Sequence, residues 1–183
     1  MTAFPPELQQ LIDRQQIYDC IVRYCSGVDR FDREMLRSVY HSDAMDDHGT
    51  FVGSRDEFIE WAIGYHEKYQ HHHKHYVLNH RCELEGTTAH TETYWLFSGK
   101  NKLGPPLSLC GGRYLDRFEK RDGRWAIAAR KCIIEWTAEP PEMVMPKENI
   151  EAAALTGVPL RNKDDASYMR PLEVMRAKFV LPF

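Results

Sequence analysis

The hydrophobic pattern changes period once along the chain, and this change restricts the fold more than any other feature. Up to about residue 70, apolar residues recur at intervals of three and four, as on the buried face of an amphipathic helix. From residue 73 to 137 the period is two, as in strands with one buried face. Helices followed by a run of strands predict an α+β fold with helices packed on one face of an antiparallel sheet.

Helical periodicity before residue 70 predicts three helices. The first begins at residues 5–6, where two prolines favour a first helical turn, and ends at Gly27. Asp32 is the expected N-cap of the second helix, over residues 33–40. Residues 41–49 are too polar for a core element and predict a turn into a short edge strand or hairpin, with solvated acidic side chains.

A capping box starts the third helix and glycine-containing turns separate the strands. Ser54 and Glu57 form the box, and the helix carries aromatic residues on its buried side. Asp122-Gly123 is a strong hairpin signal, and Gly111-Gly112 indicates a bulge or bend within a strand. We expect a strongly curved, mostly antiparallel sheet that closes over three helices and leaves a cone-shaped cavity. The predicted strands are residues 75–80, 89–98, 107–118 and 124–136.

Length and composition favour one domain with an extension. At 183 residues and 43% hydrophobic content the chain can build one full core, which we place at residues 1–137. Residues 138–183 form a C-terminal extension with a helix predicted at 147–155. The extension is too apolar for a solvated tail, so we expect it to pack on its own domain or on a neighbouring subunit of a homo-oligomer, a dimer or trimer. Its apolar residues are Tyr168, Met169, Leu172, Val174, Met175, Phe179, Val180, Leu181 and Phe183.

The charge distribution and the cysteine pattern limit which classes of partner and which cellular compartment we expect. The formal net charge is −3 and the basic residues are scattered, so a nucleic-acid partner is not expected. The sequence has neither a signal peptide pattern nor 18 consecutive apolar residues, so we expect no membrane partner. The five cysteines form no Cys-x-x-Cys pair and lie in apolar contexts, which is typical of reduced thiols and predicts a cytoplasmic protein. Among the classes of partner, a small hydrophobic or aromatic substrate agrees best with this composition.

The position of Asp29, an acidic residue, needs either a structural or a functional explanation. It lies at the joint between the first two helices, where Asp32 already accounts for the cap. It is either a further cap, a solvated residue or a catalytic group, and a histidine held by it would become an oriented base near neutral pH. His75, at the start of a strand, is the candidate partner. Tyr24 reaches the same space or is an ordinary core tyrosine.

For Arg130 and for the histidine run at residues 71–73, the sequence alone allows more than one interpretation. Arg130 lies among small apolar residues of the last strand, where it either faces solvent or needs an anionic or carbonyl partner. The run His71–His73 reads as a solvated loop. A metal site there is not favoured, because consecutive residues do not converge easily on one ion.

These residues carry a resemblance to a known family. Residues 17–136 resemble the SnoaL-like branch of the NTF2-like superfamily, through Gly27-Val-Asp29, Lys74-His-Tyr76 with Asn79, and Arg121-Asp-Gly-Arg-Trp125 followed by Arg130. In its dehydratase and dehydrochlorinase members, which use no cofactor, an aspartate holds a histidine and an arginine helps to bind the substrate or the departing group. The resemblance assigns these roles to Asp29, His75 and Arg130, with Tyr24 as a fourth catalytic residue. The sequence differs from scytalone dehydratase at Val28, where a resemblance to that enzyme would require a tyrosine. No residue here matches the second histidine of that enzyme.

The resemblance implies a cofactor-free lyase that acts on an apolar, ring-containing small molecule. Dehydratase-type elimination is the expected reaction, and carbon–carbon cleavage with loss of a small aldehyde is a variant of it. Alternatives are an isomerase or cyclase on the same Asp-His dyad, or a non-catalytic small-molecule binding module. The expected substrate-binding residues are Trp61, Tyr65, Trp95, Phe97 and Asn79, although the four aromatic ones also suit an ordinary core.

Overall fold

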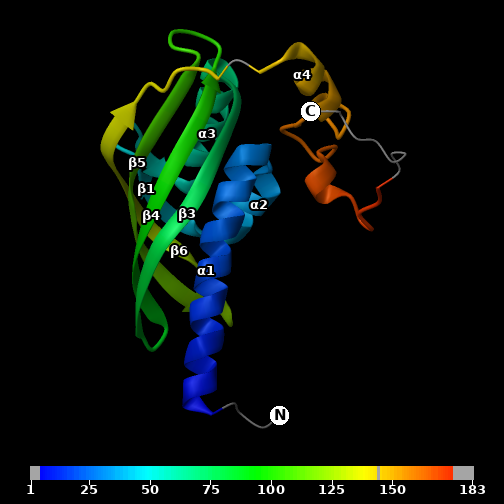
Figure 1. Ribbon diagram of the computed structural model, residues 1–183. Helices are drawn as coiled ribbons and strands as arrows, with labels where there is room; N and C mark the ends of the chain where they lie inside the picture. Colours follow the sequence, from blue (N-terminus) through cyan, green and yellow to red (C-terminus); the bar gives the residue numbers. More distant parts are fainter. Residues whose placement is uncertain (1–4, 144, 175–183) are drawn as a thin grey trace.

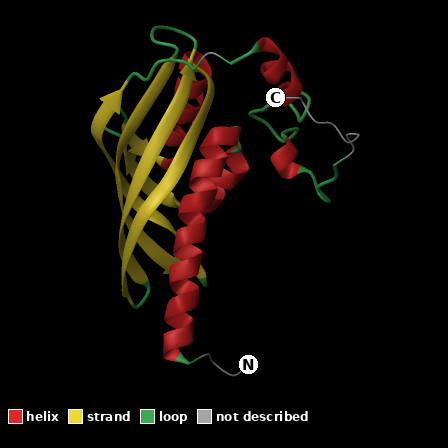
Figure 2. Ribbon diagram, in the orientation of Figure 1, coloured by secondary structure: helices red, strands yellow, loops and turns green. Residues whose placement is uncertain are grey.

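Helices cover one face of a single sheet (Figures 1 and 2). The computed structural model describes residues 5–143 and 145–174. Its helices are α1 (Pro6–Arg30), α2 (Arg33–Val39), α3 (Arg55–Tyr69) and α4 (Lys147–Ala154), with a 3₁₀ turn at Ala166–Tyr168. Its strands are β1 (Tyr40–Asp47), β2 (Val52–Ser54), β3 (Gln70–Glu85), β4 (Thr88–Asn101), β5 (Leu107–Arg121) and β6 (Arg124–Ala138). The predicted α+β architecture is confirmed.

The sheet is mixed, with the order β2-β1-β6-β5-β4-β3. Strands β3 to β6 form an antiparallel meander, whereas β1 pairs with β6 in parallel. Residues 41–49 were expected to form a turn into a short edge strand or hairpin. The edge strand is β2, in a hairpin with β1, but residues 41–47 belong to β1, which lies inside the sheet. Asp46 is consequently buried, so the prediction that the acidic residues here are solvated is wrong for this one.

The end of α1 differs from the prediction and determines where Asp29 lies. The helix continues through Gly27 to Arg30, and Phe31 closes it in a left-handed conformation with φ of 54°. Gly27 instead permits close packing, because a Cβ at this position would lie 2.8 Å from the side chain of Leu36. Asp32 caps α2 as predicted, by accepting a hydrogen bond of 3.0 Å from the backbone N–H of Met35. Asp29 therefore lies in the last turn of α1.

One hydrophobic core joins the helices to the sheet. The predicted capping box at the start of α3 is present, and Glu57 accepts a hydrogen bond of 2.9 Å from the backbone N–H of Ser54. On α3 the core contains Phe58, Ile59, Ala62 and Ile63, and Trp61 packs against it, whereas Tyr65, expected on the buried side, is exposed. The largest fully buried side chains are Trp125, Tyr24, Tyr40, Tyr114, Phe58 and Phe118.

The glycines of β5 and of its hairpin behave as the sequence indicates. Asp122 and Gly123 both have positive φ, 51° and 78°, in the turn between β5 and β6. The register between these strands shifts between Gly111 and Gly112. A Cβ on Gly112 would lie 1.9 Å from the backbone carbonyl oxygen of Ile133, whereas one on Gly111 would meet the ring of Trp136.

Gly112→Ala is therefore expected to destabilise the protein by about 2–4 kcal/mol, because two strands must separate to admit the methyl group. Gly111→Ala is the matched control, since the half-exposed Trp136 side chain can move aside. Urea unfolding of both variants measures the difference in the free energy of unfolding. Equal losses would show that the bend does not depend on Gly112.

The C-terminal extension contacts the helices beside Asp29. The predicted helix at 147–155 is α4. Asp165 forms an ion pair of 3.2 Å with Arg30, and Asp32 accepts a hydrogen bond of 2.8 Å from the hydroxyl of Tyr168. Of the apolar residues singled out in the sequence, Met169, Leu172 and Val174 are exposed, and Met175, Phe179, Val180, Leu181 and Phe183 lie outside the described residues. In the described part of the chain, no helix has the length and hydropathy to span a membrane.

Candidate active site

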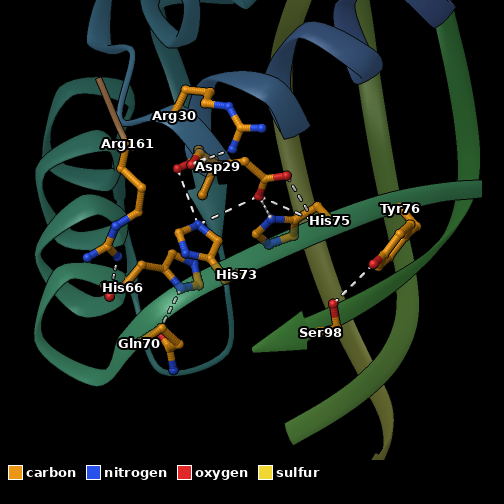
Figure 3. A network of polar contacts seen from close by, with 10 residues as sticks. Asp29, Arg30, His66, Gln70, His73, His75, Tyr76, Ser98 and Arg161 are labelled. Carbon is orange, nitrogen blue, oxygen red and sulfur yellow. Dashed lines mark hydrogen bonds and ion pairs between the residues drawn. The ribbon is translucent and has the colours of Figure 1, made fainter. Parts of the chain in front are cut away.

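Asp29 and His75 meet where the end of α1 crosses β3 (Figure 3). His75 Nδ1 lies 2.7 Å from Asp29 Oδ1, and the backbone N–H of His75 donates to both carboxylate oxygens, at 3.2 and 3.1 Å. An acid in the last helical turn opposes the helix dipole, and these donors offset that cost. The ring is therefore held with its proton on Nδ1, which leaves Nε2 as the free base.

The ring of His75 lines an apolar cavity of about 340 Å³ between the helices and the sheet. Four of the five residues expected to bind substrate also line it, namely Trp61, Tyr65, Trp95 and Phe97. The fifth, Asn79, is exposed and lies outside the lining, because the register of β3 against β4 shifts between Val77 and His80. The bulge interrupts the alternation that would have placed Asn79 on the side of His75.

Tyr24 and two cysteines line the same cavity, and burial keeps all three protonated. Burial raises the pKa of Tyr24 well above its usual value, although the nearby charge of Arg130 opposes the shift. It likewise raises the pKa of Cys110 to about 11 and that of Cys132 to about 12. Tyr24 can therefore donate a hydrogen bond but not act as a base at neutral pH, and neither thiol supplies a thiolate nucleophile.

Arg130 lies beneath the cavity floor rather than in it. Its guanidinium forms a bidentate pair with Asp116, at 2.7 and 2.8 Å, and both side chains are fully buried. It is sandwiched between the rings of Tyr24 and Tyr114, 4.1 and 4.2 Å from their centroids. Burial alone would lower the pKa of Arg130, but Asp116 raises it well above its usual value. The anionic partner expected for this residue is thus Asp116, and Arg130 is not among the residues that line the cavity.

Two neutral histidines, His66 and His73, lie beside the Asp29–His75 pair. The strand β3 begins five residues before the predicted strand, so the prediction of a loop at His71–His73 is wrong. His71 and His72 are exposed as predicted, whereas His73 is buried. Its ring stacks on that of His66, with centroids 4.0 Å apart, and His66 lines the cavity. Burial, reinforced by neighbouring histidines, lowers the pKa of His66 to about 3 and that of His73 to about 2.

A histidine kept neutral in the folded state makes the protein sensitive to acid. Below a pH of about 6.5 the unfolded chain takes up a proton at residue 73 that the folded chain excludes, so stability falls as pH falls. His73→Gln is expected to reduce the slope of unfolding free energy against pH, between about pH 6 and 4, by about 1.4 kcal/mol per pH unit. Urea unfolding across this range measures the slope, with the exposed His71→Gln as control. A slope unchanged by His73→Gln would mean that His73 is protonated in the folded protein.

Asp29, His73 and His75 also place three potential metal-ligand atoms within 4.8 Å of one another. Hydrogen bonds already use these atoms. His73 Nε2 lies 3.3 Å from the carbonyl oxygen of Val28, to which it donates, and His75 Nδ1 donates to Asp29. A metal ion would have to displace both protons, so the geometry corresponds to a hydrogen-bonded network.

A second histidine–aspartate pair was not found from the sequence. His48 Nδ1 lies 2.5 Å from Oδ1 of the buried Asp46, and the ring of His48 lines the cavity. The hydroxyl of Tyr24 lies 3.5 Å from His48 Nε2. The available signal was the spacing of two between Asp46 and His48, which directs both side chains to one face when the segment is extended.

Comparisons with solved structures identify the fold. A hexachlorocyclohexane dehydrochlorinase (LinA) type 2 matches with a TM-score of 0.71 and 21% identity, over 77% of this chain and 98% of that one. A putative scytalone dehydratase from Novosphingobium aromaticivorans matches with a TM-score of 0.65 and 19% identity, over 74% and 92%. Rv3472 of Mycobacterium tuberculosis, a protein of unknown function, matches with a TM-score of 0.64 and 21% identity, over 85% and 90%. These similarities make the fold NTF2-like.

A comparison with curated proteins gave no significant match. The sequence pattern of the SnoaL-like domain, by contrast, matches residues 9–131. This segment contains most of α1, all of α2 and α3, and most of the sheet, together with Asp29, His75 and Arg130. Because the match covers more than half of the chain, the protein belongs to the SnoaL-like domain family.

Proposed function

We propose that the protein is a cofactor-independent lyase that removes water, or a comparable leaving group, from a small, ring-containing, largely apolar molecule. The carrying observation is the 2.7 Å contact between Asp29 and His75, on a ring that lines a largely apolar cavity. His75 Nε2 takes a proton from a carbon next to an activating group such as a carbonyl. Asp29 fixes the ring orientation and stabilises the imidazolium that forms.

The lining of the cavity supports the choice of substrate class. Aromatic side chains from α3 and β4 line the same cavity as His75, and the ring of Phe97 lies 5.2 Å from that of His75. A cavity of about 340 Å³ is at the small end of ligand pockets, roughly 300–1,000 Å³. A compound with one or two rings fits within such a volume.

The structural relatives support an elimination. A dehydrochlorinase and a putative dehydratase share the fold, and the reactions in their names both break a bond from carbon to a leaving group. In this chain the base is His75, and the neutral hydroxyl of Tyr24 is a hydrogen-bond donor for charge that develops on the substrate. We assign Arg130 a positioning role, because it packs against the ring of Tyr24.

A substrate screen tests the proposal. The purified protein is incubated with β-hydroxy and β-halo ketones that carry one ring, and the conjugated alkene is followed by absorbance. At least one compound should be converted by the parent protein and not by His75→Gln. Conversion at equal rates by both proteins would refute the role of His75, and tight binding without conversion would favour a binding module.

A further inference from the structure

We infer that His48, held by Asp46, is a second proton-transfer residue of the cavity and protonates an oxygen leaving group. This inference rests on the proposed elimination and specifies its leaving group. A halide leaves without a proton, whereas a hydroxyl or alkoxide oxygen leaves readily only when an acid protonates it. The second pair therefore favours substrates that lose water or an alcohol.

The contacts of Asp46 show that the pair is built for one orientation of the ring. Asp46 is fully buried, and Oδ2 accepts a hydrogen bond of 2.7 Å from the hydroxyl of Tyr40. Its other oxygen, Oδ1, binds His48 Nδ1 at 2.5 Å. The Nδ1 of His48 therefore carries a proton, and Nε2 is the atom left to exchange protons with a ligand.

The Nε2 atom of His48 lies among aromatic rings of the cavity and close to one hydroxyl group. The ring lies 4.8 Å from that of Phe58 and 6.0 Å from that of Trp61, by centroids. The hydroxyl of Tyr24, 3.5 Å from Nε2, is the closest polar neighbour on α1. An oxygen bound here would receive hydrogen bonds from Tyr24 and His48 together. The other titratable groups that line the cavity are Tyr65 and His66 on α3, His75 on β3, Cys110 and Tyr114 on β5, and Cys132 on β6, with Glu139 after β6.

The two pairs divide the reaction between them. At one wall, the carbon–hydrogen bond breaks and its proton moves to His75 Nε2, while the electron pair forms the double bond. At the other, the carbon–oxygen bond breaks with its electron pair on oxygen. His48 enters this step as the imidazolium, with Nδ1–H bonded to Asp46, and its Nε2–H supplies the proton that completes water or an alcohol. His75 then releases its proton to solvent and His48 regains one, so no other reactant is consumed. Asp46 is a positioning residue.

Two ketones that differ only in leaving group test this role. 4-Phenoxybutan-2-one releases phenol, which needs a proton on departure, and 4-(4-nitrophenoxy)butan-2-one releases a stable nitrophenolate. His48→Gln is expected to lower kcat/KM about 100-fold for the phenoxy compound and less than about 5-fold for the nitrophenoxy compound. Asp46→Asn should show the same selectivity in weaker form, and His75→Gln should lower both rates equally. Equal losses with His48→Gln would show a purely structural role and overturn the inference, without affecting the assignment of His75.

A binding measurement decides the matter if neither ketone is converted. 4-Nitrophenol mimics the departing oxygen, and its absorbance reports both binding and ionisation. His48→Gln should weaken its binding about 10-fold, and His75→Gln less than about 3-fold. Binding that is lost with His75 and kept without His48, or no binding to the parent protein, would contradict the placement of the oxygen at His48.

Discussion

Replacing His75 by glutamine is expected to lower kcat about 10³- to 10⁴-fold on any substrate identified by the screen, because glutamine cannot take a proton from carbon. Asp29→Asn should lower kcat about 10²- to 10³-fold, since the ring loses its orienting carboxylate and the charge that stabilises the imidazolium. The measurement is single-turnover kinetics near neutral pH. KM should change little, because the dyad acts on the transition state.

The double variant Asp29→Asn/His75→Gln makes this prediction specific. If the two residues act as one unit, the double variant is no slower than His75→Gln alone. His80→Gln is the matched control. It lies on the same strand and its Nδ1 is bonded to Thr93, at 2.9 Å, outside the cavity lining. Multiplicative losses in the double variant would instead indicate separate roles.

Arg130→Met is expected to destabilise the protein by about 3–5 kcal/mol, because it leaves the buried carboxylate of Asp116 without its partner. Arg130→Met/Asp116→Leu should recover most of that loss, since two apolar side chains of similar volume replace a pair whose attraction is largely offset by desolvation. Urea unfolding of the two variants at one pH measures both values.

The activity of the double variant separates packing from catalysis. If Arg130 only supports the ring of Tyr24, the stable double variant should keep its rate within about 10-fold of the parent. A loss beyond about 10³-fold in a fully folded double variant would show that the guanidinium acts on the substrate directly. A single variant as stable as the parent would contradict the importance of the pair.

Local signals in the sequence were reliable wherever one residue determines the backbone. Asp32 caps α2, the capping box starts α3, and Asp122-Gly123 turns the hairpin between β5 and β6. Gly27 misled the prediction because its small size serves the contact with Leu36 rather than a helix end. The same residue type answers two physical needs, and only the tertiary structure shows which applies.

Only part of the candidate site could be predicted from the sequence, because its other contacts depend on how the strands pair. Asp29 and His75 lie in two segments that resemble a known family, and the structure brings them into contact. The Arg130–Asp116 pair and the placement of Asp46 depend on which strands are neighbours, and the exposure of Asn79 depends on a bulge. Pairings across the sheet join residues that are far apart in sequence and leave no periodic signal in a single chain.

The parallel pairing of β1 with β6 bears on the order in which the protein assembles. Strands β3 to β6 are joined by short connections and can zip up as successive hairpins, whereas β1 must wait for a strand that begins at residue 124. Loop closure over such a separation is slow compared with hairpin formation. Since Asp46 lies on β1, the corner of the cavity that contains His48 is among the last parts to form. A folding intermediate with the meander complete would already contain His75 but would not yet have the complete cavity.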